Sequence, residues 1–318
     1  MREAKRASSH PISRKEGFQR KAVIITMSNL KDLNDIIAFS DKSLVSLLPE
    51  RPERSNKATF GRVLCAAGSY CMSGAAYLSA KAAYRSGAGL VAILTPEENR
   101  VILQSSLPEA VISVYSSSSP DEDMIAETAK AASVIAAGPG IGRSEGAKRM
   151  LTACLRSSNK PMVLDADALN IIAENPRLWE IVPRGSVITP HPGEMSRLCG
   201  CTVDEILDDV GGICRGFAAA HGVVCVLKDH RTAVSDGTDP LSSLYLNDTG
   251  NSGMATGGSG DVLTGIIAAL LAQGMPPFAA AVLGVRIHGA AGDEAARNLG
   301  EYSMMASDII DAIPKVLK

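Results

Sequence analysis

The stretch Ser133-Val-Ile-Ala-Ala-Gly-Pro-Gly-Ile-Gly142 joins a short apolar run to a turn that contains three glycines. A helical pattern follows at residues 145–156. An apolar run without polar alternation is typical of a strand that is covered on both faces. This succession of strand, tight turn and helix therefore predicts one unit of a parallel α/β sheet.

The same succession occurs on both sides of this stretch. Strands are expected at residues 62–67, 90–94, 110–114, 133–137, 161–164, 186–189 and 223–227. Helices are expected between them at residues 74–86, 96–104, 121–131, 145–156, 166–174, 193–198 and 202–220. Strands that alternate with helices in this way favour a parallel sheet with helices on both faces.

The pattern changes after residue 227. Residues 232–235 and 241–246 predict a pair of short strands around the turn Asp236-Gly237. A glycine-rich loop, a helix at 260–272 and two further helices follow. Length alone would suggest about two domains, but no compositional break or repeat divides the chain. We therefore expect one domain over residues 27–318.

The N-terminal segment is different in character. Residues 1–26 carry seven basic and two acidic side chains and show no clear periodicity. They are interpreted as a disordered tail, a weak transit-like peptide, or an extension upstream of a functional start at Met27. A tail or a mis-started extension is the preferred interpretation. Residues 29–48 are expected to add a helix.

Composition excludes several classes of function. The 318 residues are 46% hydrophobic and 21% charged, as in a globular protein with a large core. A net charge of −2 and 4% aromatic residues argue against nucleic-acid binding. The most apolar helical stretch, 262–275, is too short to span a membrane, and the seven scattered cysteines lack zinc-site spacing. A cytoplasmic protein without nucleic-acid or membrane partners is expected.

One loop is unusually rich in glycine. Six of the 17 residues from 249 to 265 are glycine, and the centre of the loop reads Thr256-Gly-Gly-Ser-Gly-Asp261. Glycine lets the backbone approach a ligand closely, and the start of a helix has unpaired N–H groups that attract anions. These features predict a phosphate site formed by Gly257, Gly258, Ser259 and Gly260.

Asp261 begins the helix that follows this loop, where its carboxylate would repel a bound phosphate. A carboxylate in this place is useful if it accepts a proton or lies beside a metal. Asp261 is therefore predicted to be a general base that deprotonates a hydroxyl group attacking phosphorus. The alternative is that the glycines serve helix packing and that Asp261 only caps the helix.

Acidic and histidine side chains follow two of the expected strands, at the sheet edge where open α/β folds bind ligands. Asp165 and Asp167 either cap a helix, or one of them lies near phosphate and Mg²⁺ through water. In Thr189-Pro-His-Pro-Gly-Glu194, two prolines stiffen the loop. This favours His191 as a ligand contact, whereas Glu194 either orients a metal-bound water or caps its own helix.

Taken together in this order, the segments 68–89, 138–142, 163–170, 189–194 and 251–265 resemble the ADP/ATP-dependent NAD(P)H-hydrate dehydratases of the ribokinase-like superfamily. The resemblance extends from about residue 40 to the C-terminus. It implies a ribokinase-like three-layer α/β/α fold with a mostly parallel central sheet. It also implies a stand-alone member without the fused epimerase domain, whose functional partner is a separate epimerase, and a homo-oligomer, with a tetramer as the specific expectation.

The reaction that the resemblance implies is a repair. The S forms of the hydrated nucleotides NADHX and NADPHX are dehydrated to NADH and NADPH, with Mg²⁺ and with ADP, which yields AMP and phosphate, or with ATP. Hydroxide leaves poorly, so the hydroxyl group is phosphorylated first and phosphate then leaves. Asp261 would be the base, and the N–H groups of the glycine-rich loop would stabilise the transferring phosphoryl group.

The resemblance also assigns binding residues. The hydrate substrate would contact Ala75, Gly140, Gly142, His191 and Asp261. The adenosine nucleotide would contact Lys228, Asp229, His230, Arg231 and Thr232, together with Gly257, Gly258, Ser259 and Gly260. Mg²⁺ would lie near Asp165 and Glu194, through water.

One position departs from the family pattern, because Asp229 follows Lys228 where members usually have glycine. The carboxylate is expected to weaken nucleotide binding or to change the preferred donor. Two other functions compete with the dehydratase. A small-molecule kinase of the same fold would use Asp261 and the glycine-rich loop equally well, and a nucleotide-binding regulator would keep the pocket without turnover.

Overall fold

The computed structural model describes residues 44–238 and 244–318. The described strands form one nine-stranded sheet in the order β3-β2-β1-β4-β5-β6-β7-β8-β9. They are β1 (Arg62–Ala66), β2 (Leu90–Pro96), β3 (Val111–Tyr115), β4 (Val134–Ala137), β5 (Val163–Leu164), β6 (Val187–Ile188), β7 (Val224–Leu227), β8 (Ala233–Ser235) and β9 (Leu244–Leu246). The first seven pair in parallel, and β8 and β9 add an antiparallel edge.

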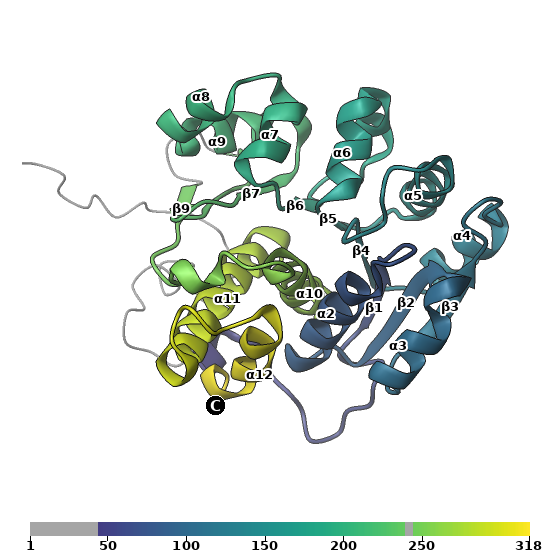
Figure 1. Cartoon of the computed structure of the whole chain (residues 1–318), viewed down its shortest axis with the longest axis horizontal. Helices are drawn as coiled ribbons and strands as arrows, with labels where there is room; N and C mark the ends of the chain where they lie inside the picture. The colour runs from purple at the N-terminus through teal and green to yellow at the C-terminus, as the bar shows by residue number, and fades with distance from the viewer. Residues whose placement is uncertain (1–43, 239–243) are drawn as a thin grey trace, which may run out of the picture.

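Helices cover both faces of this sheet, which gives the expected three layers (Figure 1). One layer consists of α2 (Ser73–Arg85), α3 (Arg100–Ser106), α10 (Ser259–Ala272), α11 (Pro277–Leu299) and α12 (Ala306–Val316). The other consists of α4 (Glu122–Lys130), α5 (Glu145–Ser157), α6 (Asp167–Glu174), α7 (Pro192–Cys199), α8 (Val203–Asp208) and α9 (Val210–His221).

Burial on both faces explains why the strands read as continuous apolar runs. In β1, Val63 and Cys65 pack into the core on the α2 side, whereas Leu64 and Ala66 pack into the core on the α5 side. All four are fully buried. Because successive strand residues point to opposite faces, a strand covered on both sides needs an apolar residue at every position. None of the described helices is long and apolar enough to cross a bilayer.

Two expected helices are interrupted. The helix expected at 202–220 is instead two helices, α8 and α9, separated at Asp209. The Asp209 carboxylate accepts a hydrogen bond from the Gly212 N–H at 2.8 Å, so it caps the start of a new helix. The helix expected at 96–104 begins late because Pro96 belongs to β2, and a short 3₁₀ turn (Glu97–Asn99) precedes α3.

The N-terminal expectations lie largely outside the described residues. This holds for the extension 1–26, for residues 29–43 of the expected helix, and for residues 241–243 of the expected last strand. The described end of the expected helix is a single 3₁₀ turn (Leu44–Leu47) rather than an α-helix.

The loops after the parallel strands meet at the carboxyl edge of the sheet, where ligands bind in open α/β folds. The N–H of Gly68, after β1, donates to the carbonyl of Pro139, after β4, at 2.8 Å. The N–H of Lys228, after β7, donates to the carbonyl of Pro190, after β6, also at 2.8 Å. These bonds hold the loops of distant strands against one another and define the place of the site.

Candidate active site

The glycine-rich loop ends at the start of α10. Gly258 is the residue before the helix, its φ is +89°, and no side chain caps the first turn. A Cβ at Gly258 would overlap Leu78, and a Cβ at Gly260 would lie 3.3 Å from Nζ of Lys228. The backbone at these positions is therefore packed as closely as glycine permits, and the first N–H groups of α10 have no side-chain cap. This arrangement suits an anion.

Asp261 lies in the first turn of α10 and is half-buried. Burial, reinforced by repulsion from the Asp165 carboxylate, raises the pKa of Asp261 to about 7, although the charge of Lys228 opposes this shift. A carboxyl group with a pKa near neutrality can accept a proton in the pH range where enzymes work. Its position beside an anion site and its pKa both fit a general base.

A buried ion pair lies next to this base. Asp165 is 1% exposed, and its Oδ1 accepts from Nζ of Lys228 at 2.8 Å while its Oδ2 accepts from Oγ1 of Thr264 at 2.9 Å. Burial disfavours the charge of Lys228, but the carboxylates of Asp165 and Glu194 raise the pKa of Lys228 above its ordinary value. Lys228 therefore keeps its positive charge beside the start of α10.

Asp165 and Glu194 do not fit a directly bound Mg²⁺ ion. Both oxygens of Asp165 already have partners, and the Lys228 ammonium lies 3.9 Å from Oε2 of Glu194. A second cation between these carboxylates would be repelled by Lys228. Within residues 44–238 and 244–318, no three His, Cys, Asp or Glu side chains are grouped so that they could hold a metal ion.

His191 and Glu194 form a reciprocal cap at the start of α7. Nδ1 of His191 accepts from the N–H groups of Gly193 and Glu194, and Oε2 of Glu194 accepts from the N–H of His191 at 2.9 Å. Of the two roles that the sequence left open for Glu194, the structure shows capping. Burial and then the charge of Lys228 lower the pKa of His191, which favours the neutral ring. Because Nδ1 accepts two hydrogen bonds, the ring proton belongs on Nε2, which lies 3.3 Å from Oε1 of Glu194.

The loops predicted to bind the hydrate substrate are packed together. A Cβ at Gly140 would lie 2.8 Å from Cβ of Ala75, so the first turn of α2 and the loop after β4 approach as closely as glycine allows. The N–H of Gly142 donates to Oδ2 of Asp167 at 2.9 Å. Neither Asp165 nor Asp167 caps α6 with its side chain, because both carboxylates reach across to other loops.

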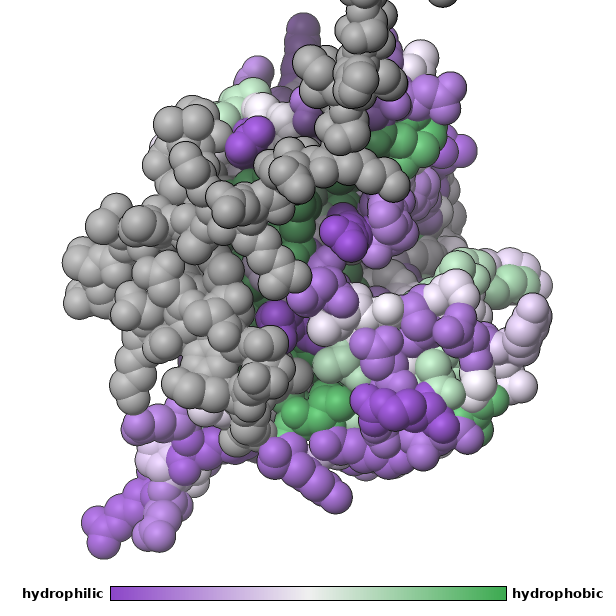
Figure 2. All heavy atoms as spheres, turned by 90° about the vertical axis from the view of Figure 1, so that its left-hand side faces the viewer, coloured by the Kyte–Doolittle hydropathy of each residue, from purple (hydrophilic) through white to green (hydrophobic). Residues whose placement is uncertain are grey.

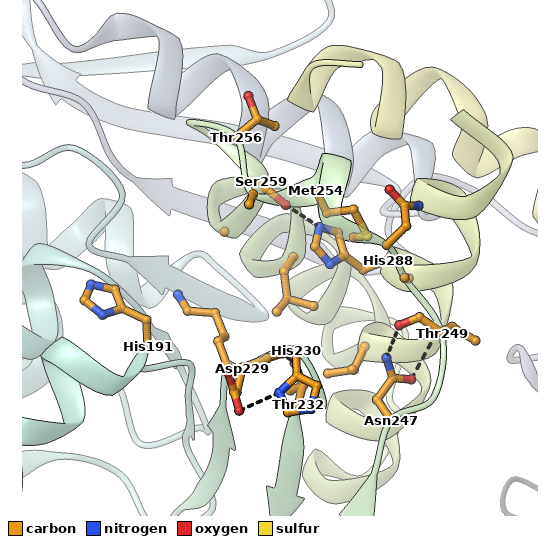
Figure 3. A pocket seen from close by; sticks show the side chains of 18 of the residues that line it. His191, Asp229, His230, Thr232, Asn247, Thr249, Met254, Thr256, Ser259 and His288 are labelled. Carbon is orange, nitrogen blue, oxygen red and sulfur yellow. Dashed lines mark hydrogen bonds and ion pairs between the residues drawn. The ribbon is translucent and has the colours of Figure 1, made fainter. Parts of the chain in front are cut away.

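A cavity of about 930 Å³ collects most of the predicted polar residues (Figure 3). Those that line it are Asp165, His191, Glu194, Lys228, Asp229, His230, Thr232, Ser259, Gly260 and Asp261. The other residues of the predicted site do not line the cavity. They are Ala75, Gly140, Gly142, Arg231, Gly257 and Gly258. In the part of this face that Figure 2 draws in colour, hydrophilic residues predominate, with smaller hydrophobic groups between them.

Several lining residues were not predicted from the sequence. They come from the segment after β9 and from α11: Asn247, Thr249, Met254, Val285 and His288. For Asn247, Thr249 and Met254, the only signal in the sequence was that they lie in or next to the glycine-rich loop. His288 is a single histidine in an otherwise apolar helical pattern, which is far more often a core residue than a ligand contact.

Asp229 and His230 lie at the mouth of the cavity as a pair. Nδ1 of His230 is 3.0 Å from Oδ2 of Asp229, and Oγ1 of Thr232 donates to the carbonyl of Asp229 at 3.3 Å (Figure 3). The His230 side chain is 81% exposed. The Asp229 carboxylate thus has the His230 ring as a neighbour, and both residues line the cavity.

A three-layer α/β/α molecule with a mostly parallel sheet and a polar cavity at the carboxyl edge of that sheet fits the ribokinase-like class. Its sheet, mostly parallel and covered by helices on both faces, is shared by a solved protein of that superfamily. The match to the NAD(P)H-hydrate dehydratase family model over residues 63–315 shows that this chain belongs to that family.

Individual relatives agree with this placement. The bifunctional NAD(P)H-hydrate repair enzyme of Moorella thermoacetica is 42% identical over 281 residues, which are 86% of this chain and 52% of that protein. The chain therefore spans about half the length of the bifunctional relatives it matches. The ADP-dependent (S)-NAD(P)H-hydrate dehydratase of Neisseria meningitidis is 38% identical over 82% of this chain and 86% of its own length.

A solved structure shows the same architecture. The ADP/ATP-dependent NAD(P)H-hydrate dehydratase of Bacillus subtilis, co-crystallised with ATP and Mg²⁺, superposes with a TM-score of 0.73 at 32% identity. The match covers 86% of this chain and 94% of that one.

Proposed function

We propose that this chain dehydrates the S forms of NADHX and NADPHX to NADH and NADPH at the expense of a nucleotide. The observation that carries the proposal is Asp261, whose pKa of about 7 and place at the start of α10 suit a base beside a bound phosphoryl group. The ADP-dependent activity of the Neisseria relative favours ADP, and the Bacillus structure with ATP and Mg²⁺ keeps ATP as an alternative.

We assign the steps of this reaction to residues of the cavity. Asp261 takes the proton from the substrate hydroxyl group, whose oxygen attacks the terminal phosphorus of ADP, and the bond to the bridging oxygen breaks to release AMP. The first N–H groups of α10 stabilise the charge on the transferring phosphoryl group. Phosphate then leaves the substrate with the bonding electrons, and a proton is lost from the neighbouring carbon to restore the double bond.

Lys228 supports this chemistry through its charge. It is held between Asp165 and Glu194, and its Nζ would lie 3.3 Å from a Cβ at Gly260, next to the anion site. A fixed positive charge at this distance attracts the phosphates and opposes the rise in the pKa of Asp261. We expect the Asp165–Lys228 pair to be needed for the charge balance of the cavity rather than for proton transfer.

The remaining expectations depend on this function. Ala75, Gly140, Gly142 and His191 would contact the hydrate, and the segment 228–232 with the glycine-rich loop would hold the nucleotide. Mg²⁺ would arrive on the nucleotide phosphates and reach Asp165 and Glu194 only through water. The chain would act in the cytoplasm as one domain, as a homo-oligomer, with a separate epimerase as its functional partner; the second activity of the bifunctional relatives supports a partner of this kind.

The test is direct conversion. Purified chain is incubated with (S)-NADHX, Mg²⁺ and either ADP or ATP, and NADH is followed by its near-ultraviolet absorbance while AMP or ADP is separated by chromatography. NADH and nucleotide product should appear in equal amounts. A stable phosphorylated product from a vitamin or sugar alcohol, with no NADH, would instead support the small-molecule kinase.

A further inference from the structure

His288 lines the cavity from α11, a helix that supplies none of the predicted catalytic groups. Its Nε2 lies 3.2 Å from Oγ of Ser259, which is the first residue of α10 and is 8% exposed. Figure 3 shows the histidine ring between Ser259 and the residues of the segment after β9. The contact thus joins α11 to the start of the helix that forms the anion site.

The ring of His288 is uncharged. Burial, together with the positive charge of Lys228, lowers the pKa of His288 to about 4, although a hydrogen bond with the Ser259 backbone opposes the shift. A neutral imidazole has one N–H donor and one acceptor nitrogen. Nε2 is used by Ser259, and Nδ1 has no hydrogen-bond partner among the residues that the structure describes. One polar atom of His288 is therefore left for a ligand.

The surroundings of His288 indicate which part of a ligand would meet it. The neighbouring lining residues on this side of the cavity are uncharged: Asn247, Thr249, Met254, Val285 and Gly289. Lys228 pairs with Asp165, and the first turn of α10 begins at Ser259 without a side-chain cap. A neutral ring among neutral neighbours suits a ribose hydroxyl group or a base, and not a phosphate.

The rest of α11 is built to hold the same segment. Gly289 packs so closely that a Cβ there would overlap Thr249, and a Cβ at Gly292 would overlap Met254. One turn further, Asp293 accepts hydrogen bonds from the Gly250 N–H at 3.0 Å and from the Asn251 amide at 2.9 Å. One face of α11 therefore fastens the chain from Thr249 to Ser259 at successive points.

We propose that His288 is a positioning residue that links the nucleoside part of the nucleotide to the anion site: Nδ1 bonds to the nucleoside, and Nε2 holds the Ser259 hydroxyl group and with it the first turn of α10. The inference rests on the proposed use of an adenosine nucleotide. It adds to that function a residue that senses nucleotide binding and aligns the phosphoryl-binding backbone.

Two amide variants separate the two contacts. The amide of asparagine overlays the Nδ1 side of histidine, so His288→Asn keeps the nucleoside contact and loses the bond to Ser259. The longer His288→Gln reaches the Nε2 position, so it keeps Ser259 and loses the nucleoside contact. We expect H288Q to raise the KM and the dissociation constant for ADP about five- to tenfold with little change in kcat. H288N should lower kcat by a similar factor with little change in ADP affinity.

Ser259→Ala and His221→Gln are the matched variants. S259A removes only the partner of Nε2, so it should resemble H288N and not H288Q. His221 is also a partly buried histidine, but it stacks on Trp179 and Phe217 and does not line the cavity. H221Q should change the thermal midpoint without separating kcat from KM, which excludes a general effect of losing an imidazole.

ADP binding, measured by calorimetry without NADHX, separates this inference from the proposed function. If H288Q binds ADP as tightly as the unaltered chain, or if H288N and H288Q have the same effect on kcat and KM, the assignment of His288 is overturned. If the chain shows no NADHX turnover but H288Q still weakens ADP binding and H288N does not, the assignment stands and the proposed function is wrong.

Discussion

Nζ of Lys228 lies 2.8 Å from Oδ1 of Asp165, a carboxylate that is 1% exposed. The pair joins the loop after β7 to the loop after β5 and lies directly beside Gly260 at the start of α10. An ion pair this deep stabilises little by itself, but removal of one partner leaves an uncompensated buried charge. The relationship therefore connects the stability of the fold to the charge of the cavity.

Replacement of Lys228 by methionine should lower the free energy of unfolding by about 3 to 5 kcal/mol, because Asp165 is left buried and unpaired. Chemical denaturation with the m-value checked for each variant measures this. Lys228→Arg retains the charge and should lose much less. Equal losses in the two variants would show that shape, and not charge, is what the cavity requires.

The pH dependence of turnover should report Asp261. The base works only when deprotonated, so kcat/KM for the hydrate should rise with pH through about 7, the pKa of Asp261. Lys228 opposes the rise in this pKa, so its removal should move the acid limb to higher pH. A pH profile of K228R should keep the limb near its original place, because arginine retains the charge. A flat profile between about pH 5 and 8 would contradict the role of Asp261.

Asp261→Asn should lower the rate of turnover and raise the free energy of unfolding. Because burial raises the pKa of Asp261, the folded chain binds this proton more tightly than the unfolded chain does. The stability that the protonated group contributes is lost as the pH rises through about 7. Asparagine carries no charge, so D261N should unfold with a free energy higher by roughly 1 to 3 kcal/mol at pH 8, a difference that vanishes towards about pH 4. Asp208→Asn, on an exposed position of α8, should show no such difference.

Asp229 should limit nucleotide binding. Its carboxylate faces the cavity and would repel phosphates, so Asp229→Asn should tighten ADP binding by about two- to fivefold and ATP binding by more, since ATP carries more charge. Titration calorimetry at low and high salt measures both constants, and the gain should shrink as salt is added. His230→Gln removes the nearby partner of Asp229 and should act in the opposite direction. Tighter binding in H230Q would refute the repulsion.

Two neighbouring glycines should respond differently to alanine. Gly258 has a φ of +89° and no room for a Cβ beside Leu78, so Gly258→Ala should lower the free energy of unfolding by about 1 to 3 kcal/mol. Gly257 has open space within 4 Å of its Cβ position and should tolerate alanine far better. Thermal midpoints of the two variants compare them directly, and similar losses would mean that loop flexibility, and not the backbone conformation of Gly258, is what matters.

Much of the fold could be predicted because local patterns and the final packing agree. The parallel strands are buried on both faces, and their continuous runs of apolar residues predict this burial from the sequence. The break at Asp209 was missed because the apolar spacing continues through α8 and α9. Only the capping bond to Gly212 shows that a new helix starts there.

The site was predictable where it is made of loops that directly follow strands. Asp261 was expected from the glycine-rich start of its helix and Lys228 from the family resemblance, and both line the one cavity. Contacts between side chains that are far apart in the sequence were not predicted. Asp165 and Lys228 are 63 residues apart in the sequence, and Ser259 and His288 are 29 residues apart. Neither contact could therefore be predicted from local spacing.

The measurement that tests the central claim most directly is single-turnover conversion of (S)-NADHX with ADP by the unaltered chain and by D261N, with ADP binding measured on both. We predict that the unaltered chain forms NADH, AMP and phosphate in equal amounts, and that D261N binds ADP but forms NADH at least about a hundredfold more slowly. Formation of NADH at an unchanged rate by D261N, or its absence with the unaltered chain, would contradict the account.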